Sequence, residues 1–133
     1  MIFGASTDLG SSSHTSRIIE PVLHFLLPTL SQDSVDLVVV SVRKCGHLSE
    51  YALLALMILR ARRAVLPAEE RGWRWRVAVE AFWVTVLYAA TDELHQTFVP
   101  SREGCLRDVV IDSTGGLAGL LGLWALGKWR KWW

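Results

Sequence analysis

The chain has 133 residues, of which 51% are hydrophobic and 20% are charged, and its formal net charge is +1. This length fits one domain, and the small net charge, without a basic stripe interleaved with aromatic residues, argues against a nucleic-acid-binding protein. The two cysteines, Cys45 and Cys105, are too few for a disulfide-stabilised scaffold and lack the spacing of a metal site. They can form one disulfide or remain free thiols. We therefore expect a single domain, residues 1–133, with no metal ion and no cofactor.

The N-terminal third of the chain contains only short apolar segments. Residues 1–6 form an apolar stub that is too short to cross a membrane. Thr15 is a predicted N-cap, and the apolar residues that follow it at helical spacing end at Pro28. From Asp33 onward, valines recur on one helical face, although such a run also fits a strand. We predict that residues 7–43 form an outer segment with amphipathic helices at the membrane interface.

Three longer apolar stretches follow, at residues 47–59, 77–90 and 109–127, and the spanning helices predicted from them cover residues 43–60, 77–97 and 108–126. A membrane-spanning helix needs about 20 predominantly apolar residues. The third stretch reaches this length outright, whereas the first two reach it only if their polar ends belong to the same helices. We predict an all-α membrane protein, a small helical bundle with three full transmembrane helices, a truncated first helix and short interfacial helices.

Basic residues flank these predicted spans on one side. The loop at residues 60–76 is rich in arginine, and the tail after residue 127 contains Lys128, Arg130 and Lys131. Basic residues close to spans favour the cytoplasmic side, and three spans place this loop and this tail on the same side. We therefore predict a multi-pass protein of the cell membrane with a cytoplasmic C-terminus. An aromatic belt is expected on that side, formed by Trp73, Trp75, Trp129, Trp132 and Trp133.

Polar residues gather at the opposite, outer ends of the predicted spans. They are Lys44, His47, Glu50 and Tyr51 on the first span, Asp92, Glu93, His95 and Gln96 on the second, Arg102 in the following loop, and Asp108 and Asp112 on the third. A charge facing lipid costs about 2.5–3.5 kcal/mol at the bilayer centre and less toward the interface. We therefore expect these side chains to meet around a polar pocket. The alternative is that they only hold the outer ends of the helices together.

Glycines recur along the third predicted span, at Gly115, Gly119 and Gly122. The first two form a GxxxG pattern, which allows the backbones of neighbouring membrane helices to approach closely. We predict that these three residues pack against another helix.

The polar residues occur in an order and spacing that resemble the VanZ-like family. The resemblance is carried by Lys44-x-x-His47-x-x-Glu50-Tyr51, by Asp92-Glu93-Leu94-His95-Gln96 with Phe98, Pro100 and Arg102, and by Asp108-x-x-x-Asp112-x-x-Gly115. It implies a small multi-pass membrane protein, usually with four spanning helices, that is associated with resistance to the lipoglycopeptide teicoplanin. It implies no catalytic role for any of these residues. Because members have a complete first span where this chain has only residues 1–6, we expect a misassigned start site or a truncated form.

Three functions fit these residues. The first is a non-enzymatic protein that lowers susceptibility to teicoplanin by engaging a lipid-linked or lipoglycopeptide ligand in an outer polar pocket. The second is a membrane enzyme acting on a lipid or cell-wall precursor, with Asp92 or Glu93 as the base, a histidine as the acid and Arg102 holding an anionic group. The third is a structural or regulatory partner of another membrane protein. We favour the first function, with membrane lipids as further partners, and leave open whether the protein is an enzyme.

Overall fold

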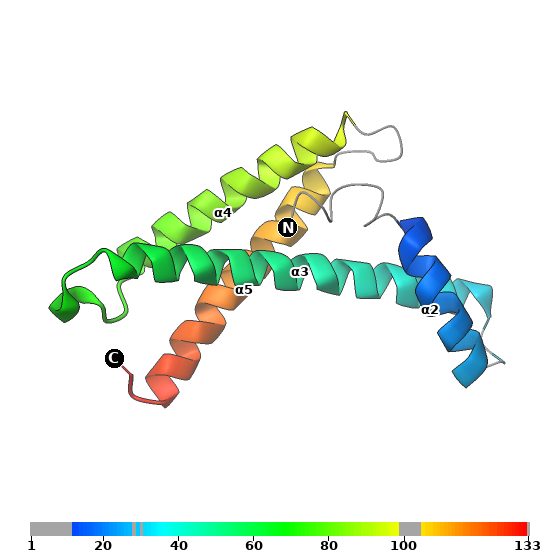
Figure 1. The fold of residues 1–133 in the computed structure, drawn as a ribbon, viewed down its shortest axis with the longest axis horizontal. Helices are drawn as coiled ribbons and strands as arrows, with labels where there is room; N and C mark the ends of the chain where they lie inside the picture. The colour runs from blue at the N-terminus through cyan, green and yellow to red at the C-terminus, as the bar shows by residue number, and fades with distance from the viewer. Residues whose placement is uncertain (1–11, 28, 30, 99–104, 133) are drawn as a thin grey trace.

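The computed structural model describes residues 12–27, 29, 31–98 and 105–132. Within these ranges every regular element is a helix, so the all-α prediction is confirmed for them. Its elements in chain order are α2 (Ser12–Leu26), α3 (Gln32–Ala64), the short 3₁₀ helix η2 (Ala68–Glu70), α4 (Trp75–Gln96) and α5 (Leu106–Trp129) (Figure 1). The predicted remnant of a first span, residues 1–6, lies outside the described residues.

The N-terminal region differs from the sequence-based expectation. Helix α2 begins at Ser12, before the predicted cap at Thr15, and ends at Leu26, close to the predicted stop at Pro28. Helix α3 runs without interruption for 33 residues, where a separate interfacial helix and a span beginning at residue 43 were expected. No proline interrupts it, and one internal glycine costs a helix only about 1 kcal/mol. The valine-rich run is therefore the first part of α3 and not a strand.

Helix α5 packs against both α3 and α4, and α3 also packs against α4. Helix α2 packs against α3, at the opposite end of α3 from the loop that leads to α4 (Figure 1). The core between the three long helices contains mainly small and branched apolar side chains, namely Ala55, Leu59, Val77, Ala78, Ala81 and Leu120. Small side chains allow membrane helices to approach closely.

Two of the three predicted packing glycines lie at the contact between α5 and α3. A Cβ atom at Gly115 would lie 2.5 Å from the backbone oxygen of Leu48, and one at Gly119 would lie 3.0 Å from the Cα of Ala52. A Cβ atom at Gly122 would have no atom within 4 Å. The close approach of the two backbones therefore involves Gly115 and Gly119, and Gly122 lies away from it.

Among the described helices, only α5 is long and apolar enough to cross a membrane by its length and composition. The polar ends of the other two predicted spans do belong to α3 and α4, which lengthens both helices but adds charged residues to them. All three helices expose large apolar side chains on the outside of the bundle, including Leu53, Met57, Trp83, Leu87, Leu117 and Leu121. Contiguous exposed apolar surface marks a binding surface for a partner or a membrane.

Candidate functional site

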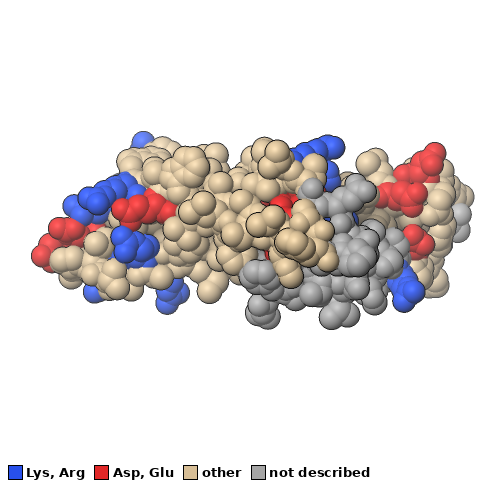
Figure 2. All heavy atoms as spheres, turned by 90° about the horizontal axis from the view of Figure 1, so that it is seen from above, with Lys and Arg blue, Asp and Glu red and all other residues tan. Residues whose placement is uncertain are grey.

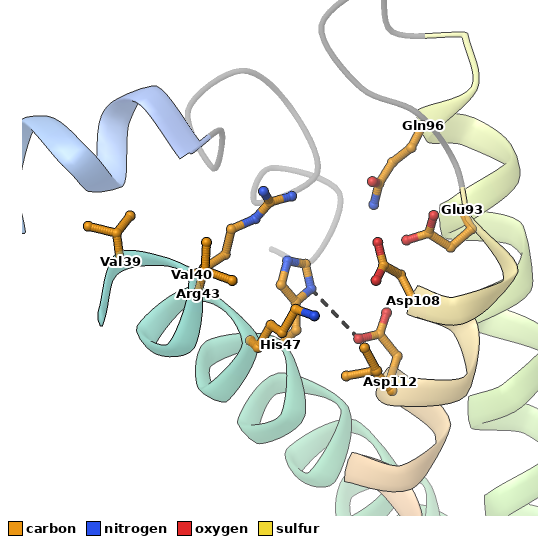
Figure 3. Close-up of a pocket in the computed structure, with 10 residues that line it drawn as sticks. Val39, Val40, Arg43, His47, Glu93, Gln96, Asp108 and Asp112 are labelled. Carbon is orange, nitrogen blue, oxygen red and sulfur yellow. Dashed lines mark ion pairs between the residues drawn. The ribbon is translucent and has the colours of Figure 1, made fainter. Parts of the chain in front are cut away.

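A cavity of about 100 Å³ lies between the N-terminal half of α3, the C-terminal end of α4 and the start of α5 (Figure 3). Its lining combines apolar and charged side chains from all three helices: Val39, Val40, Arg43, Lys44 and His47 from α3, Glu93 and Gln96 from α4, and Asp108, Ile111 and Asp112 from α5. The α3 residues recur at intervals of three or four positions, which places them on one face of the helix. Three short segments that are distant in the sequence therefore form one site.

Asp112 is the most deeply buried charged side chain of this cavity, with 2% of its surface exposed. Its Oδ1 lies 3.9 Å from the Nδ1 of His47, and this ion pair joins α5 to α3 when the histidine is protonated (Figure 3). Its Oδ2 is buried and has no hydrogen-bond partner among the described residues. A buried acceptor without a partner costs about 1–3 kcal/mol, and more when it is charged. The carboxylate thus retains an unused acceptor beside the cavity.

Asp92 is equally buried, with 1% of its surface exposed, but its surroundings differ. The Tyr51 hydroxyl donates to its Oδ2 at 3.3 Å, and Nε2 of Gln96 donates to the same atom at 3.2 Å. Neither Asp92 nor Tyr51 lines the cavity. The Asp92 carboxylate therefore joins α3 to α4 beside the cavity, with one oxygen accepting two hydrogen bonds.

Glu93 connects the end of α4 with the start of α5. Its Oε2 accepts a hydrogen bond of 2.9 Å from the backbone N–H of Cys105, the N-cap residue of α5. A carboxylate is favoured there because the first N–H groups of a helix carry partial positive charge. Since Glu93 also lines the cavity, this contact fixes one acidic wall of the site.

The structure brings together many, but not all, of the sequence-predicted residues. The residues that line the cavity are Lys44, His47, Glu93, Gln96, Asp108 and Asp112. Glu50 is partly buried outside that lining, His95 is exposed, and Arg102 lies outside the described residues. Arg43 also lines the cavity, and sequence reasoning did not select it. Its position one helical turn before His47 was the available signal.

The chemistry of the lining is mixed. Figure 3 shows the carboxylates of Glu93, Asp108 and Asp112 facing His47 and Arg43 across the cavity. Such a site can accept hydrogen bonds from a ligand or move a proton between a histidine and a carboxylate. Within the described ranges, no group of three or more His, Cys, Asp or Glu side chains could hold a metal ion. Cys45 and Cys105 are exposed free thiols, so they do not form the disulfide that the sequence left open.

Comparison with known protein families gives a match. A family model described as VanZ/LLP1 matches residues 1–127, a range that includes every residue of the cavity and almost all of α5. No curated protein and no solved structure matches the chain.

Proposed function

Because the chain belongs to the VanZ/LLP1 family, as its polar residues indicated, we propose that this membrane protein lowers susceptibility to lipoglycopeptides such as teicoplanin. In this proposal α3 and α4 cross the membrane together with α5, and the C-terminus is cytoplasmic. The arginine-rich loop between α3 and α4 and the basic tail after α5 then share the cytoplasmic side. The polar cavity faces the outer side, where a drug approaches the cell.

The observation that carries this proposal is the buried Oδ2 of Asp112 beside the cavity, which has no hydrogen-bond partner among the described residues. A carboxylate that only joined helices would be expected to use both oxygens, as buried polar groups normally do. Asp112 instead keeps an acceptor that no described residue satisfies. A ligand that offers an N–H or O–H donor, or an ammonium group, would remove the cost of burying it.

The size of the cavity limits what it can hold. Pockets for drug-sized ligands measure about 300–1,000 Å³, whereas this cavity measures about 100 Å³. It therefore suits one polar group of a larger ligand. The remainder would lie along the outside of the bundle, where Leu37 and Val40 of α3 are exposed. Teicoplanin carries an acyl chain, and a lipid-linked precursor does too, so both classes of ligand can place their apolar part in the bilayer.

The contact between His47 and Asp112 favours a second candidate, a membrane enzyme acting on a lipid or cell-wall precursor. A histidine next to a carboxylate is a common arrangement for general acid–base catalysis. The pair lines the cavity, whereas Asp92, which the sequence suggested as a base, accepts two hydrogen bonds outside it. An enzyme would change the lipid-linked precursors of a host that expresses it, and His47→Gln would abolish that change in a mass spectrum of the lipid extract.

The main proposal is tested by drug susceptibility in a Gram-positive host that lacks the gene. The host expresses the wild-type chain, Asp112→Asn or the control Glu80→Gln, at equal membrane levels. Glu80 is a carboxylate of α4 that lies outside the polar cavity. We expect the wild type and Glu80→Gln to protect against teicoplanin more than against vancomycin, and Asp112→Asn to give no protection. Equal protection by Asp112→Asn, or equal protection against both drugs, would argue against the proposal.

A further inference from the structure

The opposite end of the bundle is rich in arginine. Six arginines and three glutamates lie between residues 60 and 80. Figure 2 shows these charges gathered at the left end of the molecule, beyond a middle that is mostly uncharged. Glu80 pairs with Arg62 at 2.8 Å and with Arg76 at 3.3 Å, and Glu70 pairs with Arg74. Two of the three glutamates are therefore engaged by only half of the arginines.

The other three arginines line a second, open cavity of about 650 Å³. Its lining residues are Leu56, Arg60, Arg63, Ala64, Arg71 and Leu123, and none of them is acidic. This cavity is larger than the polar cavity and carries charge of only one sign. It therefore favours a ligand that is anionic.

Two of these arginines are fixed by the backbone of the loop. Arg63 donates from both Nε and Nη2 to the carbonyl oxygen of Arg71, the first at 2.8 Å, and Arg71 donates from Nε to the carbonyl oxygen of Leu66 at 3.1 Å. Arg60 makes no hydrogen bond or ion pair with the described residues. It lies one turn before Ala64 and one turn after Leu56, so the three share a face of α3. The cavity thus combines positioned guanidinium groups with an available one.

We infer that this cavity binds the phosphate headgroup of an anionic phospholipid in the leaflet at the arginine-rich end. Guanidinium groups bind phosphate through paired hydrogen bonds, and basic pockets between membrane helices bind anionic headgroups. Leu56, Ala64 and Leu123 form the apolar part of the lining, against which the start of an acyl chain can pack. A free anion in solution would gain nothing from this apolar part. The inference is independent of the ligand of the polar cavity.

Tryptophans at the same end of the bundle support a position at headgroup depth. The rings of Trp73 and Trp75 lie 5.4 Å apart, and the ring of Trp75 lies 5.4 Å from that of Trp124. The Nζ of Lys128 lies 5.4 Å from the centre of the Trp124 ring. Tryptophan is enriched at the membrane–water interface, where its ring is in contact with headgroups. The lipid assignment therefore fits both the charge of the cavity and the tryptophans at this end of the bundle.

The test uses native mass spectrometry of the full chain in detergent, titrated with phosphatidylglycerol or phosphatidylcholine. Arg60→Gln removes one charge from the cavity lining. Arg62→Gln is its matched control, because Arg62 lies two residues further on α3 and pairs with Glu80 outside this cavity. We expect the wild type to retain phosphatidylglycerol in preference to phosphatidylcholine. Arg60→Gln should bind phosphatidylglycerol about five-fold more weakly, the effect of roughly one basic residue near an anionic membrane surface, and Arg62→Gln should bind it like the wild type.

Three results would overturn the inference. The first is equal binding of the two lipids, and the second is an equal loss, or no loss, in the two variants. The third is binding of inorganic phosphate as strong as that of phosphatidylglycerol and equally dependent on Arg60, which would assign the cavity to a soluble anion. Circular dichroism of both variants establishes that their helix content matches that of the wild type, as expected from the exposed positions of Arg60 and Arg62.

Discussion

The two ends of the bundle differ in how far their charged side chains are buried. In and beside the polar cavity, Asp92, Glu93 and Asp112 are buried, and their contacts join different helices. At the arginine-rich end, the ion pairs of Arg62, Arg74 and Arg76 involve exposed guanidinium groups. Exposed ion pairs contribute little to stability, whereas a buried charge with an unpaired oxygen is costly. The polar cavity thus buries a carboxylate at a cost to stability that the exposed ion pairs of the arginine-rich end do not carry.

This difference suggests different roles for the two ends. A costly buried carboxylate is expected where a ligand or a reaction requires it. Exposed arginines around an open cavity cost little stability, because they remain hydrated, and they are suited to a membrane surface. By these two proposals, one end binds a specific polar group of a ligand and the other end binds anionic lipid.

The largest effect on the fold is expected from the glycine contact that brings α5 against α3 near the polar cavity. Gly115→Ala would place a Cβ 2.5 Å from a backbone oxygen of Leu48, which cannot move as a side chain can. We expect a loss of about 1–3 kcal/mol in the free energy of unfolding, the usual effect of overpacking. Gly122→Ala is the control, because a Cβ there has open space, and alanine is favoured over glycine in a helix by about 1 kcal/mol. Equal unfolding midpoints in detergent for the two variants would contradict the close contact.

A smaller loss of stability is expected from removing the hydrogen bond between Tyr51 and Asp92. Tyr51→Phe removes the hydroxyl that donates to Asp92 and retains the ring. Asp92 keeps the hydrogen bond from Gln96, so we expect a loss of about 1 kcal/mol in the free energy of unfolding. Urea unfolding of the wild type and the variant in the same detergent measures it. An unchanged unfolding free energy would remove the distinction between a paired Asp92 and an unpaired Asp112.

The smallest effect is expected at the arginine-rich end. Arg62→Gln removes one exposed partner of Glu80, and Arg76 remains as the other. Because water and salt screen exposed charges, we expect no measurable change in the unfolding midpoint. A clear decrease in the midpoint would show that this end also depends on its ion pairs, and the contrast between the two ends would disappear.

The sequence predicted the chemistry of the polar cavity better than its geometry. Helical spacing placed Lys44 and His47 on one face, and the motif residues identified the family. That Asp112 lines the cavity while Asp92 does not was not predictable, because it depends on how the helices cross and on which side chain Tyr51 reaches. That these residues bind a ligand remains a proposal.

The extent of the helices was also predicted only in part. The apolar residues of α5 predicted a spanning helix, and α5 alone meets that criterion among the described helices. Three full spans remain a prediction, because the charges at the ends of α3 and α4 lower their average hydropathy. The continuity of α3 was missed because short apolar segments separated by polar residues fit two helices as well as one. The arginine cavity could not be predicted, since it depends on how the loop after Ala64 returns toward α3.

The most direct test of the central claim, that Asp112 serves a ligand and not the fold, is the thermal unfolding midpoint of Asp112→Asn in detergent. Asparagine keeps the shape of aspartate and removes the buried carboxylate, whose Oδ2 has no hydrogen-bond partner among the described residues. We expect the midpoint to equal that of the wild type or to exceed it, with a gain on the order of 1 kcal/mol. A midpoint several degrees lower would show that the carboxylate holds the helices together, and would contradict the claim.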